Sequence, residues 1–192
     1  MVKNKTANDD FKFPSKKKAI MGRISTITNA FVQDIIPTIL PTEEEKKDFL
    51  ETLKIENTKQ CVYCGGVATT WDHFRPLVRN KKPTGYINEI SNMVPACSTC
   101  NSSKGNNDWK SWLNSETKDS LIKRGFNRDY LDKLKDKLNE YENKFQPRNI
   151  SEMLEEIWND ECEKIRTRVI NEMKKAHDEM RIQLIKLEDK LK

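Results

Sequence analysis

Two Cys-x-x-Cys pairs constrain the fold of this chain more than any other feature of its sequence. The paired residues are Cys61 and Cys64, then Cys97 and Cys100. Two residues between paired cysteines let both thiolates turn onto one ion, and Gly65 can supply the left-handed backbone that such a knuckle needs. Four thiolates complete a closed tetrahedral site. We therefore expect a structural Zn²⁺ that fixes the geometry of this region.

Disulfide bonds would be the alternative use of these cysteines. The N-terminus has lysines without a following apolar segment and cleavage site, and no stretch approaches the roughly 18 apolar residues that span a bilayer. These observations predict a soluble, cytoplasmic protein without a membrane partner, in which metal binding is favoured over disulfides. The fifth cysteine, Cys162, is expected to be a buried, unreactive thiol.

Charge is spread unevenly along the 192 residues. Lys and Arg exceed Asp and Glu by 35 to 30, which gives a net charge of +5, and charged residues are as frequent (34%) as hydrophobic ones (35%). The segment from Ile150 onward carries a net charge of −2, so residues 1–149 carry +7. One compact domain with a small core and an extension is expected, and the positive excess suits a polyanionic partner.

Apolar residues at helical spacing predict helices on both sides of the cysteine region. Pro37 should end the first helix, and Thr42 with Glu45 forms a capping-box pattern that should start the second. A short helix ended by Gly125 and a longer one before Pro147 should follow the cysteine region. The predicted organisation is a flexible basic arm (1–18), N-terminal helices (19–59), a zinc-bound module (60–108), a helical region (109–149) and a C-terminal helix (150–192).

The C-terminal segment should form one helix of about 40 residues, roughly 60 Å long. It contains no Gly or Pro from Ser151 onward, and its apolar residues follow a near-heptad stripe that is interrupted at Glu161. Such a helix could fold back along its own domain or form a coiled coil with a second copy. We favour the second reading and expect a homodimer through this helix.

Residues that carry chemistry lie between the cysteine pairs and directly after them. They stand in Trp71-Asp72-His73-Phe74-Arg75-Pro76, in Ser91-Asn92-Met93-Val94-Pro95-Ala96 and in Cys100-Asn101-Ser102-Ser103-Lys104-Gly105. Their combination resembles the HNH, or ββα-metal, endonuclease family over about a quarter of the chain. The resemblance implies two antiparallel strands followed by a helix. It also implies that Asp72 and Asn101 hold one catalytic divalent ion, that His73 is the general base, and that Asn92 braces the loop.

The residue types suit this chemistry independently of the family. A carboxylate and an amide oxygen are hard ligands for Mg²⁺ or Mn²⁺, and a neutral imidazole such as His73 can take a proton from water near neutral pH. Adjacent residues of a regular strand point to opposite faces, so Asp72 and His73 should lie at a strand end. We then expect Asp72 to point toward Asn101 and His73 toward the bound phosphate.

The predicted fold is therefore α+β and mostly helical, with a small zinc-stabilised ββα module between helices and a long C-terminal helix. Five basic side chains near the motif are expected to contact DNA phosphates: Arg75, Arg79, Lys81, Lys82 and Lys104. A solubilising loop is the alternative role for them.

The function expected is divalent-metal-dependent hydrolysis of double-stranded DNA, with a Type II restriction enzyme as the favoured biological role. A dimer of two HNH sites would cut both strands of a palindrome. The alternatives are a non-specific, homing or nicking HNH nuclease, a zinc module that binds nucleic acid without catalysis, and a scaffold that has kept a decayed nuclease fold. The intact set of Asp72, His73 and Asn101 speaks against decay.

Overall fold

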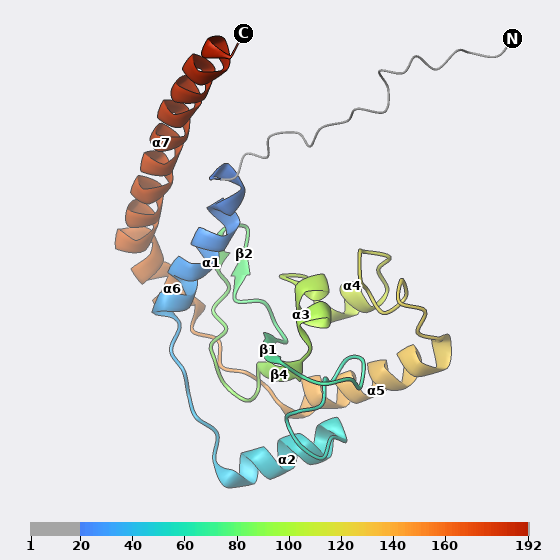
Figure 1. Cartoon of the computed structure of the whole chain (residues 1–192). Helices are drawn as coiled ribbons and strands as arrows, with labels where there is room; N and C mark the ends of the chain where they lie inside the picture. The colour runs from blue at the N-terminus through green and yellow to red at the C-terminus, as the bar shows by residue number, and fades with distance from the viewer. Residues whose placement is uncertain (1–19, 192) are drawn as a thin grey trace, which may run out of the picture.

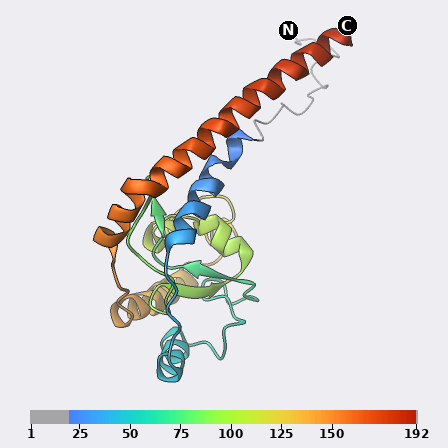
Figure 2. The same ribbon diagram turned by 90° about the vertical axis from the view of Figure 1, so that its left-hand side faces the viewer.

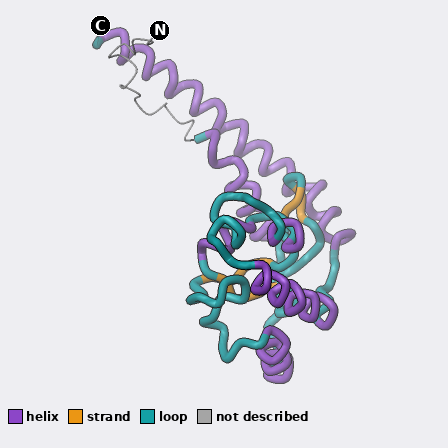
Figure 3. Tube along the Cα trace, turned by 90° about the vertical axis from the view of Figure 1, so that its right-hand side faces the viewer, coloured by secondary structure: helices purple, strands orange, loops and turns teal. Residues whose placement is uncertain are grey.

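The computed structural model describes residues 20–191 and shows helices arranged around a small central module (Figure 1). The predicted basic arm, 1–18, lies outside the described residues. Within them, strands form two separate two-stranded sheets, and helices make up most of the remaining regular structure (Figure 3). The α+β, mostly helical class predicted from the sequence is confirmed. No helix in this part of the chain is long and apolar enough to cross a membrane.

The first N-terminal helix ends, and the second begins, where the sequence predicts. A 3₁₀ turn (η2, Met21–Arg23) leads into α1 (Ile24–Ile35), which ends just before Pro37. The next helix, α2 (Glu43–Leu53), begins with the predicted capping box: Thr42 Oγ1 accepts from the Glu45 amide, and Glu45 accepts from the Thr42 amide.

The central module has the strand, strand, helix order of a ββα unit. The antiparallel pair consists of β1 (Thr70–His73) and β4 (Met93–Ala96), with Asp72 opposite Val94. Helix α3 (Ser98–Lys104) follows β4 directly, and Cys97 is its N-cap. A hairpin of β2 (Val78–Arg79) and β3 (Lys82–Pro83) lies in the segment between β1 and β4. Asn80 and Lys81 form its tight turn, and both have positive φ angles.

Two further helices close the module, α4 (Trp109–Leu113) and α5 (Arg128–Lys144). The long helix expected before Pro147 is thus confirmed as α5. The short helix expected before Gly125 is wrong, because the chain there forms successive turns, and Asp119 has a left-handed φ of 60°. Two apolar residues, Leu121 and Ile122, place this segment against the core, but they are too few to stabilise a helix.

Two apolar clusters hold the elements together. The larger one joins α2, α4 and α5 to the ββα unit and to both cysteine pairs, with Tyr63, Phe74 and Trp109 among its fully buried members. The smaller one joins α1, β2 and the start of the C-terminal segment around Val32 and Trp158. The helices on either side of the module therefore share its core.

The C-terminal segment is helical throughout, as predicted, but it is not one regular helix. A π-helical turn (η3, Trp158–Cys162) separates α6 (Ser151–Ile157) from α7 (Glu163–Lys190). This turn contains Glu161, where the heptad stripe is interrupted, and a π turn shifts the residues that follow around the helix. As a result the buried positions of α7 are Arg166 and Ile170, which face α1, and the far part of α7 extends beyond the body (Figure 2).

Candidate active site and metal centre

The four paired cysteines converge on one point, as a shared metal ion would require. Their sulfur atoms all lie within 4.8 Å of one another, and Cys64 Sγ lies 3.8 Å from Cys97 Sγ. A tetrahedral ion with sulfur ligands at about 2.3 Å has sulfur–sulfur edges of about 3.8 Å. All four are free thiols, and Gly65 has the predicted left-handed backbone, with φ of 72°. The cluster could therefore hold a tetrahedral metal ion.

Positive charge lies beside this sulfur cluster. The Arg124 guanidinium donates to Cys100 Sγ over 3.1 Å, and the half-buried Lys137 donates to the carbonyl of Val62. A hydrogen bond from the Cys100 thiol lowers the pKa of Cys61 to about 4, whereas that bond and burial raise the pKa of Cys100. The thiolate form, which is the form that binds metal, is thereby favoured at Cys61.

Asp72 lies at the floor of the site, near the end of β1. The residue is 3% exposed, and its carboxylate accepts from the Tyr63 hydroxyl over 2.5 Å and from Lys104 Nζ over 3.0 Å. Burial raises the pKa of the Asp72 carboxyl, while Lys104 and the Tyr63 hydroxyl oppose that rise. Tyr63 belongs to the first cysteine pair and Lys104 to the helix after the second, so both knuckles orient this carboxylate.

Lys104 does not have the role that the sequence predicted for it. Its side chain is completely buried, and its ammonium donates to Asp72 Oδ1 and, over 2.7 Å, to the carbonyl of His73. An ammonium that is shielded from solvent and held by two acceptors cannot contact a DNA phosphate, so the predicted phosphate contact is wrong. Lys104 instead fixes the end of β1.

His73 is the last residue of β1, which confirms that the Asp-His pair lies at a strand end. Its Nε2 lies 2.7 Å from Asn88 Oδ1. Burial lowers the pKa of His73 below its ordinary value, although the Asn88 contact and the Asp72 charge oppose this shift. The imidazole is consequently neutral near pH 7 and can accept a proton.

The two predicted asparagines have different surroundings. Asn101, at the centre of α3, donates through Nδ2 to the carbonyl of Trp71, and no described residue hydrogen-bonds to its Oδ1. Asn92 is fully buried: it accepts from the Arg75 amide and donates to the carbonyls of Arg75 and Ile87. Asn92 therefore links the loop after β1 to the segment before β4 and does not reach the open part of the site.

A cleft of about 390 Å³ brings the predicted catalytic residues together. Asp72, His73 and Asn101 all line it, and Asn29 and Gln33 of α1 line its other wall. A second hollow of about 200 Å³ lies around the turn of the β2–β3 hairpin and shares Asn29 and Asn106 with the cleft. Helix α1, which the sequence gave no reason to place here, thus forms part of the site.

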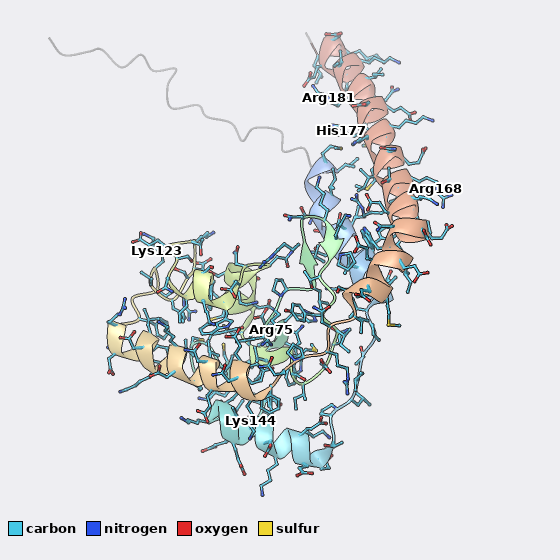
Figure 4. All side chains as sticks on the ribbon, turned by 180° about the vertical axis from the view of Figure 1, so that it is seen from behind. Arg75, Lys123, Lys144, Arg168, His177 and Arg181 are labelled. Atoms are coloured by element: carbon cyan, nitrogen blue, oxygen red, sulfur yellow. The ribbon has the colours of Figure 1, made fainter. Side chains whose placement is uncertain are left out.

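The remaining basic residues divide into two groups. Arg75 points into the body (Figure 4), where it donates to the carbonyls of Ser91 and Glu142 and lies over the rings of Phe74 and Tyr86. Because its side chain is 15% exposed and engaged in these contacts, the predicted phosphate contact of Arg75 is not available in this structure. The other three predicted residues are exposed at the hairpin, and none has an ion pair among the described residues: Arg79, Lys81 and Lys82.

Sequence reasoning missed Tyr63, Lys104 and Asn88 as contacts of the Asp-His pair. The position of Lys104 could have been found, because Cys97, Cys100, Asn101 and Lys104 recur at helical spacing and so share one face of α3. Tyr63 and Asn88 lie outside any such repeat. Only the fold brings them to the pair.

These features define a ββα module with a cysteine knuckle, whose cleft presents a carboxylate, an imidazole and an amide. In agreement, residues 61–107 match the family model described as HNH endonuclease. The chain thus contains an HNH endonuclease domain, which spans its sulfur cluster, β1, β4 and α3. No curated protein and no solved structure matches the chain in the corresponding comparisons.

Proposed function

We propose that this protein is a divalent-metal-dependent endonuclease that hydrolyses phosphodiester bonds of double-stranded DNA. The observation that carries this proposal is the cleft in which Asp72, His73 and Asn101 meet. His73 would take a proton from the attacking water, since its lowered pKa keeps the imidazole neutral at the pH of the reaction. The match of residues 61–107 to HNH endonucleases supports the same reaction class.

The oxygen atoms at this site fit a hard divalent cation. Asp72 Oδ1 accepts only from Lys104 among the described residues, and Asn101 Oδ1 accepts no hydrogen bond there, so both retain lone pairs. Asp72 and Asn101 would hold the ion, preferably Mg²⁺ or Mn²⁺. When bound, it would stabilise negative charge on the phosphoryl oxygens and the leaving oxygen. Tyr63 and Lys104 would hold the Asp72 carboxylate in place.

A separate, structural ion, Zn²⁺, is proposed for the cysteine cluster. Four sulfur ligands leave no open coordination position, so this ion would not contact substrate. It would instead anchor Tyr63 before the site and α3 after it. The oxygen ligands of Asp72 and Asn101 therefore favour a catalytic Mg²⁺ or Mn²⁺, and the four sulfur ligands favour a structural Zn²⁺.

The β2–β3 hairpin is the part of the surface that we propose for phosphate contacts. Arg79 and Lys81 line the hollow that adjoins the catalytic cleft, and Lys82 lies beside them. Replacing all three by Gln should reduce the slope of log binding affinity against log salt by up to about 3, at about 0.9 for each lost phosphate contact. Lys123→Gln is the matched control, because Lys123 pairs with Glu116 away from the cleft. An unchanged slope would remove the hairpin from the DNA path.

A homodimer through α7 and a Type II restriction role are finer parts of the proposal. Beyond α1, apolar residues recur along α7 and at its C-cap, at alternating spacings of four and three, and are at least a third exposed: Met180, Leu184, Leu187 and Leu191. Figure 4 shows Arg181 in this extended part. Two copies could bury this seam against each other, and two sites related by symmetry could cut both strands. Light scattering should then give the mass of two chains, and Leu184→Asp with Leu187→Asp should give one.

The central proposal is tested by incubating supercoiled plasmid with the full chain in Mg²⁺, in Mn²⁺ and in a chelator. Nicked or linear DNA should appear only with the divalent ions. His73→Ala should abolish the products, whereas His177→Ala, which changes the other histidine of the chain, should retain them. Binding without cutting by the wild-type protein under all conditions would instead favour a non-catalytic zinc module that binds nucleic acid.

A further inference from the structure

Asn88 connects the imidazole of His73 to the linker between α1 and α2. Its Oδ1 lies 2.7 Å from His73 Nε2, and its Nδ2 donates to Thr38 Oγ1 over 3.2 Å. The same linker holds its backbone: the Ile39 amide donates to the Asn88 carbonyl, and the Asn88 amide donates to the carbonyl of Pro37. The linker therefore fixes the position of Asn88 and holds its side-chain amide against the imidazole.

We propose that Asn88, held by Thr38, is a positioning residue that fixes the tautomer of His73, so that Nδ1 is the nitrogen that accepts the proton. A neutral imidazole has one N–H donor and one acceptor nitrogen. The amide oxygen of Asn88 can only accept, so the proton resides on His73 Nε2 and the lone pair on Nδ1. The structural part stands on these contacts alone, and its catalytic consequence rests on the proposed nuclease function.

The opposite orientation of the amide would have the opposite result. If Asn88 presented Nδ2 to the ring, Nε2 would have to accept and the proton would reside on Nδ1. Thr38 does not distinguish these cases by itself, because its hydroxyl can donate as well as accept. The two orientations differ in one observable property, the protonated nitrogen of His73.

The linker between α1 and α2 thereby takes part in the reaction. The segment 37–39 lies outside the HNH match at 61–107, yet its backbone and Thr38 hold the residue that contacts the catalytic imidazole. Residues before the module would then contribute to catalysis without touching substrate. Partners that orient metal-ligating histidines are worth about 10- to 100-fold in activity, and we expect a contact that orients a general base to have an effect of similar size.

Nitrogen NMR of the full, zinc-loaded chain without added Mg²⁺ tests the tautomer directly. The chain has two histidines, so ¹⁵N-histidine labelling gives two ring systems, and His177→Ala assigns them. Above the titration range of the imidazole, His73 should show a protonated Nε2 and an unprotonated Nδ1. Asn88→Leu, which removes the acceptor at similar volume, should shift His73 toward a mixture. A protonated Nδ1 in the wild type, or an unchanged tautomer in Asn88→Leu, would overturn the proposal.

Cleavage kinetics separate positioning from general damage to the fold. Asn88→Leu should lower kcat about 10- to 100-fold with little change in KM, and Asn88→Asp, which keeps an acceptor opposite Nε2, should recover most of that loss. Thr38→Val should show a smaller effect in the same direction, and Asn143→Leu, at an exposed position of α5, should show none. If the wild type cuts no DNA but has the expected tautomer, only the nuclease function fails. If it cuts and Asn88→Leu cuts equally well, the positioning role fails.

Discussion

Replacing Lys104 by Met should destabilise the fold strongly, because it removes one half of a buried ion pair. Lys104 is completely buried and Asp72 is 3% exposed, so no solvent can take the place of the lost ammonium. Breaking such a pair from one side costs about 3–5 kcal/mol of unfolding free energy. A typical domain has only about 5–15 kcal/mol in total, so the loss is easily measured by urea denaturation.

The loss should depend on pH, because the remaining Asp72 can be neutralised by a proton. Burial already raises the pKa of Asp72, and Lys104 opposes that rise. In Lys104→Met the folded-state pKa therefore lies above the unfolded one, and the protonated carboxyl is favoured in the folded state. The deficit is smallest below the unfolded pKa and grows as the pH rises toward the folded pKa. The free energy of unfolding of Lys104→Met should thus lie further below that of the wild type at pH 8 than at pH 5.

A second substitution tests whether the loss of stability comes from the broken ion pair. Lys104→Met with Asp72→Asn removes both charges, so the double variant should be more stable than the sum of the two single losses predicts, and its deficit should not grow with pH. Additive losses, or a Lys104→Met deficit that is equal at pH 5 and pH 8, would show that the ion pair does not hold the end of β1.

Three further predictions concern the cysteine cluster, His73 and an ion pair within α7. Cys97→Ser should lose the bound zinc and unfold at a lower denaturant concentration, whereas Cys162→Ser should retain the zinc and the wild-type unfolding midpoint. Metal analysis measures the first property, and denaturation followed by circular dichroism measures the second. The cleavage rate should rise with pH with a midpoint below the ordinary histidine pKa of about 6.5, because burial lowers the pKa of His73, and a midpoint above it would contradict the burial argument. A hydrogen bond from Arg166 lowers the pKa of Glu163 in the folded state. This pair therefore stabilises the fold at pH values above the pKa that Glu163 has in the unfolded chain, and the contribution is lost as the pH falls through its pKa in the folded state. Glu163→Gln should lower the free energy of unfolding by about 0.5 kcal/mol near neutral pH and make the melting temperature less sensitive to acid. A melting temperature that falls with acid as steeply as in the wild type would contradict a stabilising role of this pair.

Local rules predicted the parts of the fold that depend on neighbours in sequence. The capping box at Thr42, the end of α1 before Pro37 and the left-handed Gly65 all follow from contacts within a few residues. The short helix predicted before Gly125 is wrong because two apolar residues fit a buried turn as well as a helix, and tertiary burial of Leu121 is enough to place a turn there.

The sequence motif predicts which residues form the candidate site, but it does not predict the side chains that contact them from elsewhere in the fold. The four cysteines converge as their spacing predicted, and Asp72, His73 and Asn101 share one cleft. Long-range contacts decided the rest: Tyr63, Lys104 and Asn88 meet the Asp-His pair only after β1, β4 and the α1–α2 linker are in place. A basic residue is expected at the surface by default, so the sequence alone predicts a DNA contact for Lys104 and gives no sign of its buried ion pair.

The central claim is most directly tested by the single-turnover cleavage rate of an end-labelled DNA duplex in Mg²⁺, with the product ends identified. The wild type should cut to leave 5′-phosphate ends, and His73→Ala, shown to fold by circular dichroism, should be slower by about 10²- to 10⁴-fold, the range typical of a lost general base. Cleavage by His73→Ala at the wild-type rate, or no Mg²⁺-dependent cleavage by the wild type, would contradict the assignment of this cleft as a nuclease site.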